Sequence, residues 1–376
     1  MAWLTGSKHA QAKRLVDQLD DPAARLAAVS GLVRMGADAI PALLEGNGTL
    51  PPARQEVLAR MGPAAIPSLG KILNEAHPLQ RARAAQALGL TRDPAAVPIL
   101  IDALRSPYHT VRAAAASALS LLNDLRALSP LLTALKDPEP GVRASAIPAL
   151  AALRDLAAFE AITDLLLDDP LIEVRQAAAR ALGSLRDPAA LPSLMQALHD
   201  SFWWYEREAA AADLLESIQA TGEAAVPLLI TALRDPEGAV RRYAAILLGR
   251  LGDSRALEPL ALALYDLHHD VGEAAARAIG DMGAAGLEVL DEAARHPEAS
   301  IRTHAALALG AIQNGRSVTL LLQLLNDHER AVRLQAVLSL GGFQDAGARA
   351  ALRELAADRS DRELQSMARQ ALGLAS

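Results

Sequence analysis

The chain has 376 residues, of which 51% are hydrophobic but only 3% aromatic, a composition suited to thin helices packed closely through small side chains. With 37 basic and 44 acidic residues the net charge is −7, which excludes a general attraction to nucleic acid or to an anionic membrane. There are no cysteines, so disulfides, thiolate metal sites and a cysteine nucleophile are excluded.

The first residues contain no recognisable targeting segment. The apolar run within residues 1–8 is too short for a signal peptide. No stretch approaches the roughly 18 consecutive apolar residues that a membrane-spanning helix needs. We therefore expect a cytoplasmic protein with neither a membrane nor a nucleic acid as its partner.

A motif similar to Val-Arg-x-x-Ala-x-x-x-Leu recurs along the chain, and we call the place of its arginine the anchor position. About twelve such units of about 31 residues fill the sequence, as in a repeat protein. The anchor positions are Arg25, Arg54, Arg81, Arg112, Arg143, Arg175, Arg207, Arg241, Gly272, Arg302, Arg333 and Gln365.

Each unit places small and large apolar residues at fixed distances from its anchor position. Alanine stands three residues later in every copy except one, where Val57 replaces it, and a large apolar residue stands seven later. These positions share one face of a helix and predict its buried stripe. The residue eight later is glycine in eight copies, from Gly62 to Gly373, which suggests a left-handed helix end.

A second helix follows in each unit, for example over residues 96–104 and 225–233. An aspartate twelve residues after the anchor recurs, and we interpret it as the N-cap residue of the segment that follows. The predicted fold class is all-α, an α-α superhelix (solenoid) of helix pairs. We expect one solenoid domain over residues 1–376, with capping repeats over about 1–36 and 346–376.

The motif resembles the short HEAT-like repeats of the phycobilisome-lyase type, and the resemblance covers essentially residues 8–374. In HEAT repeats an aspartate precedes the conserved arginine, and here that spacing is six residues. The resemblance implies a ladder of these side chains from unit to unit and arginine-bearing helices on the concave face. The implied ladder residues are Arg112, Arg143, Arg175, Arg241 and Arg333 with Asp137, Asp169, Asp235 and Asp327.

Three features depart from the regular repeat. Gly272 stands where the ladder arginine is expected, and Pro148 lies inside an anchor helix, which it should kink. Glycines and prolines between residues 46 and 52 lengthen one turn. We expect the superhelix to bend at these places.

Four aromatic residues gather in one predicted turn, namely Phe202, Trp203, Trp204 and Tyr205. One hypothesis is a protein-binding hot spot, because tryptophan and tyrosine dominate such sites. The alternative is that these rings cover the open end of a helical layer.

The exposed face of the anchor helices should carry the residues two, five and nine positions after each anchor. They form a mixed strip of charge that either grips a partner protein or is ordinary solvated surface. The candidate binding residues of this strip are Arg180, Tyr243, Arg250, Arg277 and His304, and its other members include Arg83, Gln86, Glu216, Asp281 and Gln335.

Seven of the nine histidines fall in or beside the turns that precede the anchor helices. Adjacent helices lie about 8–10 Å apart, so histidines of different units are not expected to share one ion. Only His268-His269-Asp270 is compact, and we interpret it as polar turn surface. We predict no metal and no cofactor.

No catalytic signature is present: the chain lacks GxGxxG, a phosphate-binding loop, GxSxG and HExxH. The predicted function is a non-catalytic scaffold that binds a partner protein through the concave face or the aromatic turn. The alternative is a bilin lyase or chromophore-protein chaperone of the lyase class. A deoxyhypusine hydroxylase is disfavoured, because its several His-Glu pairs are reduced here to His328-Glu329.

Overall fold

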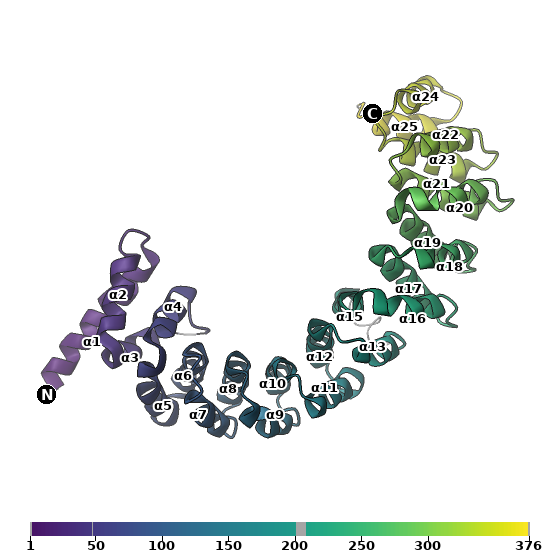
Figure 1. Cartoon of the computed structure of the whole chain (residues 1–376). Helices are drawn as coiled ribbons and strands as arrows, with labels where there is room; N and C mark the ends of the chain where they lie inside the picture. The colour runs from purple at the N-terminus through teal and green to yellow at the C-terminus, as the bar shows by residue number, and fades with distance from the viewer. Residues whose placement is uncertain (1, 47, 201–207, 375–376) are drawn as a thin grey trace. The chain divides into compact units, whose positions relative to one another are not determined.

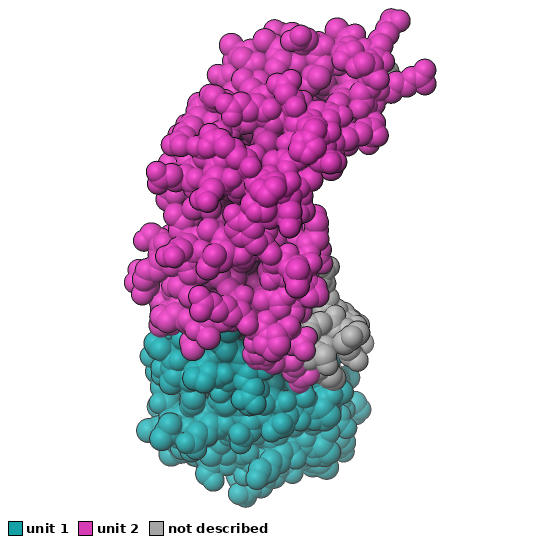
Figure 2. Space-filling view, turned by 90° about the vertical axis from the view of Figure 1, so that its right-hand side faces the viewer, with its two compact units in different colours: residues 1–197, 202–214 teal, residues 198–201, 215–376 magenta. Residues whose placement is uncertain are grey.

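The computed structural model describes residues 2–46, 48–200 and 208–374, and every regular element within them is a helix. The predicted fold class, an all-α superhelix of helix pairs, is confirmed. The chain divides into two compact units, formed by the described residues within 1–197 and 202–214 and by those within 198–201 and 215–376 (Figure 2).

The first unit contains helices α1 to α13, apart from the last residue of α13, which belongs to the second unit (Figure 1). Its helices are α1 (Ala2–Asp17), α2 (Arg25–Met35), α3 (Ile40–Leu43), α4 (Pro52–Met61), α5 (Ile66–Glu75), α6 (Pro78–Leu90), α7 (Ala96–Ala103), α8 (His109–Leu122), α9 (Leu128–Ala134), α10 (Pro140–Leu153), α11 (Leu156–Asp168), α12 (Ile172–Leu185) and α13 (Leu191–Leu198).

Helix α15 (Glu208–Ala220) crosses the division between the two units. The second unit continues the alternation. Its helices are α16 (Val226–Ala232), α17 (Gly238–Leu251), α18 (Leu257–Ala263), α19 (His269–Asp281), α20 (Leu287–Ala293), α21 (Ala299–Ala311), α22 (Gly315–Leu324), α23 (Arg330–Leu340), α24 (Ala346–Ala357) and α25 (Arg362–Ala371).

The anchor helices, those that carry an anchor position, stack on one another inside each unit. In the first unit α6, α8, α10 and α12 form one row on the inner side of that unit's curve, and α7, α9 and α11 form the other (Figure 1). In the second unit α17, α19, α21 and α23 pack in the same sequential way. Each helix therefore buries its apolar face mainly against its neighbours along the chain.

The core occupies the positions that the repeat predicts. Where the structure describes the side chain, the residue three after the anchor is buried in every unit, as Ala84, Ala244 and Ala305 illustrate. The large residue seven after the anchor is also buried, apart from the half-buried Leu372 of the last unit. Prediction of this stripe from periodicity is confirmed.

The glycines eight residues after the anchor have a different role from the predicted one. Gly62 and Gly373 do end helices with positive φ, but Gly89 and Gly249 lie inside their helices. A Cβ on Gly89 would lie 2.8 Å from the Cα of Ala118, so the glycine lets α6 approach α8 closely. The helix-end interpretation is wrong at these inner positions because α6 continues to Leu90 and α17 to Leu251, one and two residues beyond the glycine.

The chain leaves most anchor helices through a left-handed residue that lies eleven positions after the anchor. Asn123 (φ 48°) and Arg154 (φ 52°) show this geometry, and Gly252 supplies it without a side chain. The next residue is the predicted aspartate. Asp124 Oδ1 accepts the backbone N–H of Arg126 at 2.9 Å, and the equivalent bonds of the other units confirm the N-cap prediction.

Helix α10 continues through Pro148, which is exposed. One segment of the described chain, Arg25–Leu43, is long and apolar enough by composition to cross a membrane, and 39% of its window is buried. In the structure it consists of α2, a short 3-10 turn and α3, with a positive φ of 55° at Gly36. The apolar residues of this segment thus form the buried faces of two successive helices.

Replacing Leu309 by alanine tests the assignment of the core. Leu309 is fully buried in α21, so Leu309→Ala should lower the free energy of unfolding by about 2–5 kcal/mol through lost burial and a residual cavity. Urea denaturation followed by circular dichroism measures the change. Leu262 on α18 is 59% exposed, and Leu262→Ala should change stability by less than about 1 kcal/mol. Equal effects of the two substitutions would contradict the assignment.

Candidate functional site

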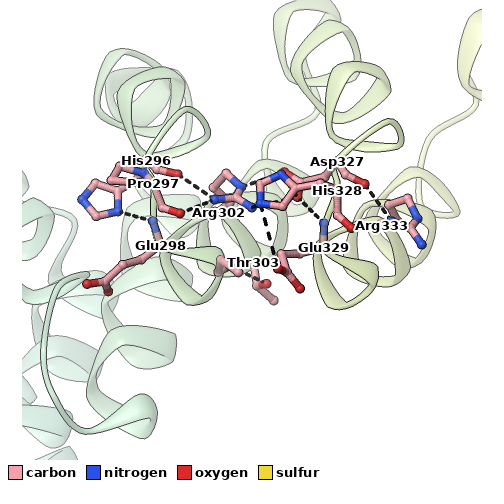
Figure 3. Close-up of polar contacts among 10 residues, drawn as sticks. His296, Pro297, Glu298, Arg302, Thr303, Asp327, His328, Glu329 and Arg333 are labelled. Carbon is pink, nitrogen blue, oxygen red and sulfur yellow. Dashed lines mark hydrogen bonds and ion pairs between the residues drawn. The ribbon is translucent and has the colours of Figure 1, made fainter.

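The arginine at the anchor position joins two successive turns, and Arg302 shows the arrangement in full (Figure 3). Its Nε and Nη2 donate to the two carboxylate oxygens of Asp327 at 2.7 and 2.8 Å. Its Nη1 donates to the backbone carbonyls of His296 and Pro297, both at 2.8 Å. The guanidinium thus forms hydrogen bonds both to the turn that precedes its own helix and to the turn of the next repeat.

The same bidentate ion pair recurs in both compact units, always between an anchor arginine and an aspartate 25 or 26 residues later. The carboxylate also accepts the N–H of the residue two positions beyond it, which orders the turn. The pairs are Arg112–Asp137, Arg143–Asp169, Arg241–Asp266 and Arg302–Asp327.

The remaining ladder residues hold the turns through backbone groups. Arg175 Nε donates to the carbonyl of Asp169 at 2.6 Å, and Arg333 Nη1 donates to the carbonyl of Asp327 at 2.7 Å. The Asp235 carboxylate accepts the N–H of Glu237, and its Oδ2 lies 3.4 Å from His199 Nε2.

Two members of the ladder are missing from the set implied by sequence. Asp266 was overlooked because it stands six residues before Gly272, where no arginine marks the spacing. Arg302 was overlooked as a ladder residue because His296 replaces the aspartate six residues before it. The usable signal was the spacing of 25 between arginine and the following aspartate, since the pair forms between units.

The ion pairs shift the acidities of their members. The hydrogen bond from Arg112 holds the pKa of Asp137 below its ordinary value, against the opposing effect of burial. For Asp327 burial acts to raise the pKa, but the hydrogen bonds from Arg302 and from the Glu329 N–H outweigh it, and the pKa is lowered. These carboxylates are therefore ionised and committed to the fold.

The strip of residues two, five and nine positions after the anchors is only partly exposed. Arg180, Arg250 and Arg277 are exposed, and Tyr243 is half-buried with the guanidinium of Arg242 5.4 Å from its ring centre. Arg180 Nη1 donates to Asp213 at 2.7 Å. Glu216 and Asp281 are exposed, and Gln86 and Gln335 are half-buried.

The expected exposure is wrong for Arg83, which is only 3% accessible. Its guanidinium donates to the carbonyls of Leu44, Glu45 and Gly48 in the lengthened turn of residues 44–51. Backbone carbonyls that follow α3 and have no partner within that helix accept hydrogen bonds from Arg83 in this way. The Arg83 side chain is therefore buried against the long turn.

The expected exposure is also wrong for His304, which is 3% accessible. Its ring covers Gly272: a Cβ on that glycine would lie 2.5 Å from His304 Cε1. Burial lowers the pKa of His304 and the neighbouring His269 lowers it further, against the Leu264 carbonyl and Glu273. The imidazole therefore takes the space that an anchor arginine would occupy.

In the first unit the exposed strip lines a groove across three anchor helices. The groove has a volume of about 730 Å³ and spans α8, α10 and α12. Small side chains such as Ser117, Ser145, Ala152 and Ser184 form most of its floor, and Arg180 lies among its charged members. Small residues at these positions leave room above the helices for another chain.

The second unit has a comparable groove of about 520 Å³ across α19, α21 and α23. Arg277 and Asp281 lie along one side of it, and Leu338 and Ser339 along the other. The predicted strip therefore forms a lined depression within each unit. Phe202, Trp203, Trp204 and Tyr205 lie outside the described residues, so their role as a binding turn stays a prediction.

Comparison with known families gives one match, to HEAT repeats, over residues 66–151, 128–215, 226–306 and 286–373. This covers well over half of the chain and confirms the resemblance stated from the sequence. No curated protein sequence matches the chain significantly.

Several solved structures are similar to this chain at low sequence identity. A mutant of Kap121p is 14% identical with a TM-score of 0.56 over 96% of this chain and 49% of that protein, so the present chain spans about half its length. The CpcE–CpcF complex of phycocyanin lyase from Nostoc sp. PCC7120 is 22% identical, with a TM-score of 0.32 over 68% of this chain and 92% of that one. Human deoxyhypusine hydroxylase is also 22% identical, with a TM-score of 0.27 over 82% and 97%.

Substitution of Asp327 by asparagine tests the ladder. The side chains of Arg302 and Asp327 are only 5% and 7% exposed, so Asp327→Asn leaves a buried guanidinium without its counter-charge while retaining an acceptor for the Glu329 N–H. We expect a loss of about 3–5 kcal/mol in the free energy of unfolding, measured by urea denaturation. The pair Arg126–Asp124 is the control, since the Arg126 side chain is exposed to solvent and Arg126→Gln should change the free energy of unfolding far less.

The same variant gives a prediction for pH. The folded-state pKa of Asp327 is lowered, so its contribution is complete above the unfolded-state value of about 3.9 and is lost as the pH falls through the folded-state value. The difference in melting temperature between wild type and Asp327→Asn should be constant from about pH 7 to 5 and shrink below about pH 4. A difference that stays constant down to pH 2 would contradict the ionised pair.

Proposed function

We propose that this chain, which belongs to the HEAT-repeat family, is a non-catalytic scaffold that binds a partner protein along its row of anchor helices. The single observation that carries the proposal is the groove across α8, α10 and α12, in which three successive repeats present the same strip positions to one depression. A stack of repeats generates such an extended surface without any residue being committed to chemistry.

The groove suits a protein segment in size and in chemistry. Its volume of about 730 Å³ lies in the range of ligand-binding clefts, but it is an open depression on a helical surface. The hydroxyls of Ser120 and Ser184 donate to backbone carbonyls of their own helices at 2.7 Å, which leaves a floor of small, largely self-satisfied side chains. Apolar contact with a few charged contacts at the edge is the pattern of protein recognition.

The charges of this face favour selectivity over general electrostatic attraction. Glu173, Arg154 and Arg180 all line the groove, so both signs are present. The buried anchor arginines cannot add to a basic surface, because their guanidinium groups are held by aspartates and backbone carbonyls. We therefore propose a protein partner in the cytoplasm and no nucleic-acid or membrane partner.

Filling the groove tests this proposal. Ala152 on α10 is exposed and lines the groove, so Ala152→Trp should occupy it without disturbing the core. Affinity capture from the native host with quantitative mass spectrometry should show a partner that is retained by wild type and lost by at least about tenfold with the variant. The matched control is Ala157→Trp, at an exposed alanine of α11 in the other row. Equal loss in both variants, or in neither, would contradict the groove.

The double substitution Trp203→Ala with Trp204→Ala separates the two predicted binding surfaces. Loss of the partner in this variant with unchanged capture by Ala152→Trp would assign binding to the aromatic turn and not to the groove. Circular dichroism should show unchanged helicity in both variants. The bilin-lyase alternative has its own measurement: a stable visible absorbance band after incubation with bilin would support it, and its absence would leave the scaffold.

A further inference from the structure

The amino-terminal turn of α19 gathers three side chains that can each supply a metal ligand. They are His269, Asp270 and Glu273, and their ligand atoms all lie within 4.8 Å of one another. His269 and Glu273 are four residues apart and so share one face of the helix, with 4.0 Å between Nδ1 and Oε2. Arg277 donates to the other carboxylate oxygen of Glu273 at 2.5 Å, which leaves Oε2 on the histidine side.

A buried histidine from the neighbouring anchor helix faces this group. His304 of α21 is 3% accessible, and neither of its ring nitrogens forms a hydrogen bond with any residue that the structure describes. Its ring centre lies 4.8 Å from that of His269, with the planes at 65°. A buried imidazole without a partner is unfavourable, because its nitrogens lose their bonds to water.

The absence of a side chain at Gly272 is what admits this ring. A Cβ there would lie 2.5 Å from Cε1 and 2.8 Å from Nδ1 of His304, and the Leu264 carbonyl lies on the same side. Neither ring nitrogen of His304 is used by a hydrogen bond within the described residues, so a ring nitrogen remains available as a ligand.

We propose that His269, Glu273 and His304 bind a single zinc ion between α19 and α21. Two imidazoles and one carboxylate form a ligand set that zinc accepts, and Asp270 or water can complete a tetrahedral shell. His269 and Asp270 are exposed and free to turn towards the ion, while the packing over Gly272 holds His304 in place.

The ion would connect two successive repeats, as the arginine–aspartate pairs of the ladder do elsewhere. Arg241 and Arg302 tie their own turns to the following turns through Asp266 and Asp327. Between them, Gly272 cannot make this connection. A zinc ion held by two residues of α19 and one of α21 would cross-link the same pair of units, and all three ligands belong to the second compact unit.

Zinc binding to the tag-free full chain tests the proposal. Isothermal titration with ZnCl₂ should give one equivalent on wild type, and His304→Gln and Glu273→Gln should each weaken it by at least about tenfold. Cobalt(II) should give a visible absorption band of tetrahedral type on wild type that both variants lose. Zinc should also raise the melting temperature of wild type and not of the variants.

The matched control is His109→Ala. His109 begins α8 and stands three residues before its anchor position, as His269 does in α19, but an alanine follows it four residues later. This variant should bind zinc as wild type does. Circular dichroism without metal must show wild-type helicity in His304→Gln, and if it does not, Glu273→Gln and His269→Ala at exposed or half-exposed positions decide the question. No binding by wild type, or equal binding by all variants, would overturn the site.

Discussion

The close approach of each anchor helix to the next is the constraint on which the other features of the structure depend. It requires small residues where the helices touch: the Cβ that Gly249 lacks would lie 2.7 Å from the Cα and Cβ of Ala278. The alanine three residues after the anchor is also fully buried, as in Ala244 and Ala275. Dense packing of this kind leaves no room for larger side chains, so the low aromatic content of the chain follows from its architecture.

Close spacing also makes the arginine ladder possible. An arginine side chain reaches the aspartate of the next turn only when successive repeats lie in the same register. The distances of 2.6 Å from Arg112 Nε to Asp137 and 2.7 Å from Arg302 Nε to Asp327 show that they do. Buried ion pairs of this type are weak contributors to net stability but are costly to break, so they favour one register over others. The unit that contains Gly272 departs from this scheme, and the imidazole of His304 occupies the vacated space.

The proposed binding surface uses positions of the anchor helices that neither the core nor the ladder occupies. The buried stripe uses one face of each anchor helix and the ladder uses its first turn, and residues two, five and nine positions after the anchor line the grooves. In the first unit that strip is mostly serine and alanine and forms a groove; in the second it carries Arg277, Asp281 and the buried His304. The two units thus present different side chains at the same strip positions.

The sequence by itself determined the repeat, the fold class, the buried stripe and the aspartate N-caps, because each of these depends on residues within one helix or one turn. It could not determine the partners across repeats, since those lie from 25 to 39 positions away in the sequence. Asp266 was not predicted as a ladder residue, because Gly272 stands at the anchor position six residues after it. Arg83 is buried because it donates hydrogen bonds to the lengthened turn. His304 is buried because its ring packs against Gly272. Only the tertiary structure decides such contacts, because the space available to a side chain is set by what the neighbouring helix lacks as much as by what it carries.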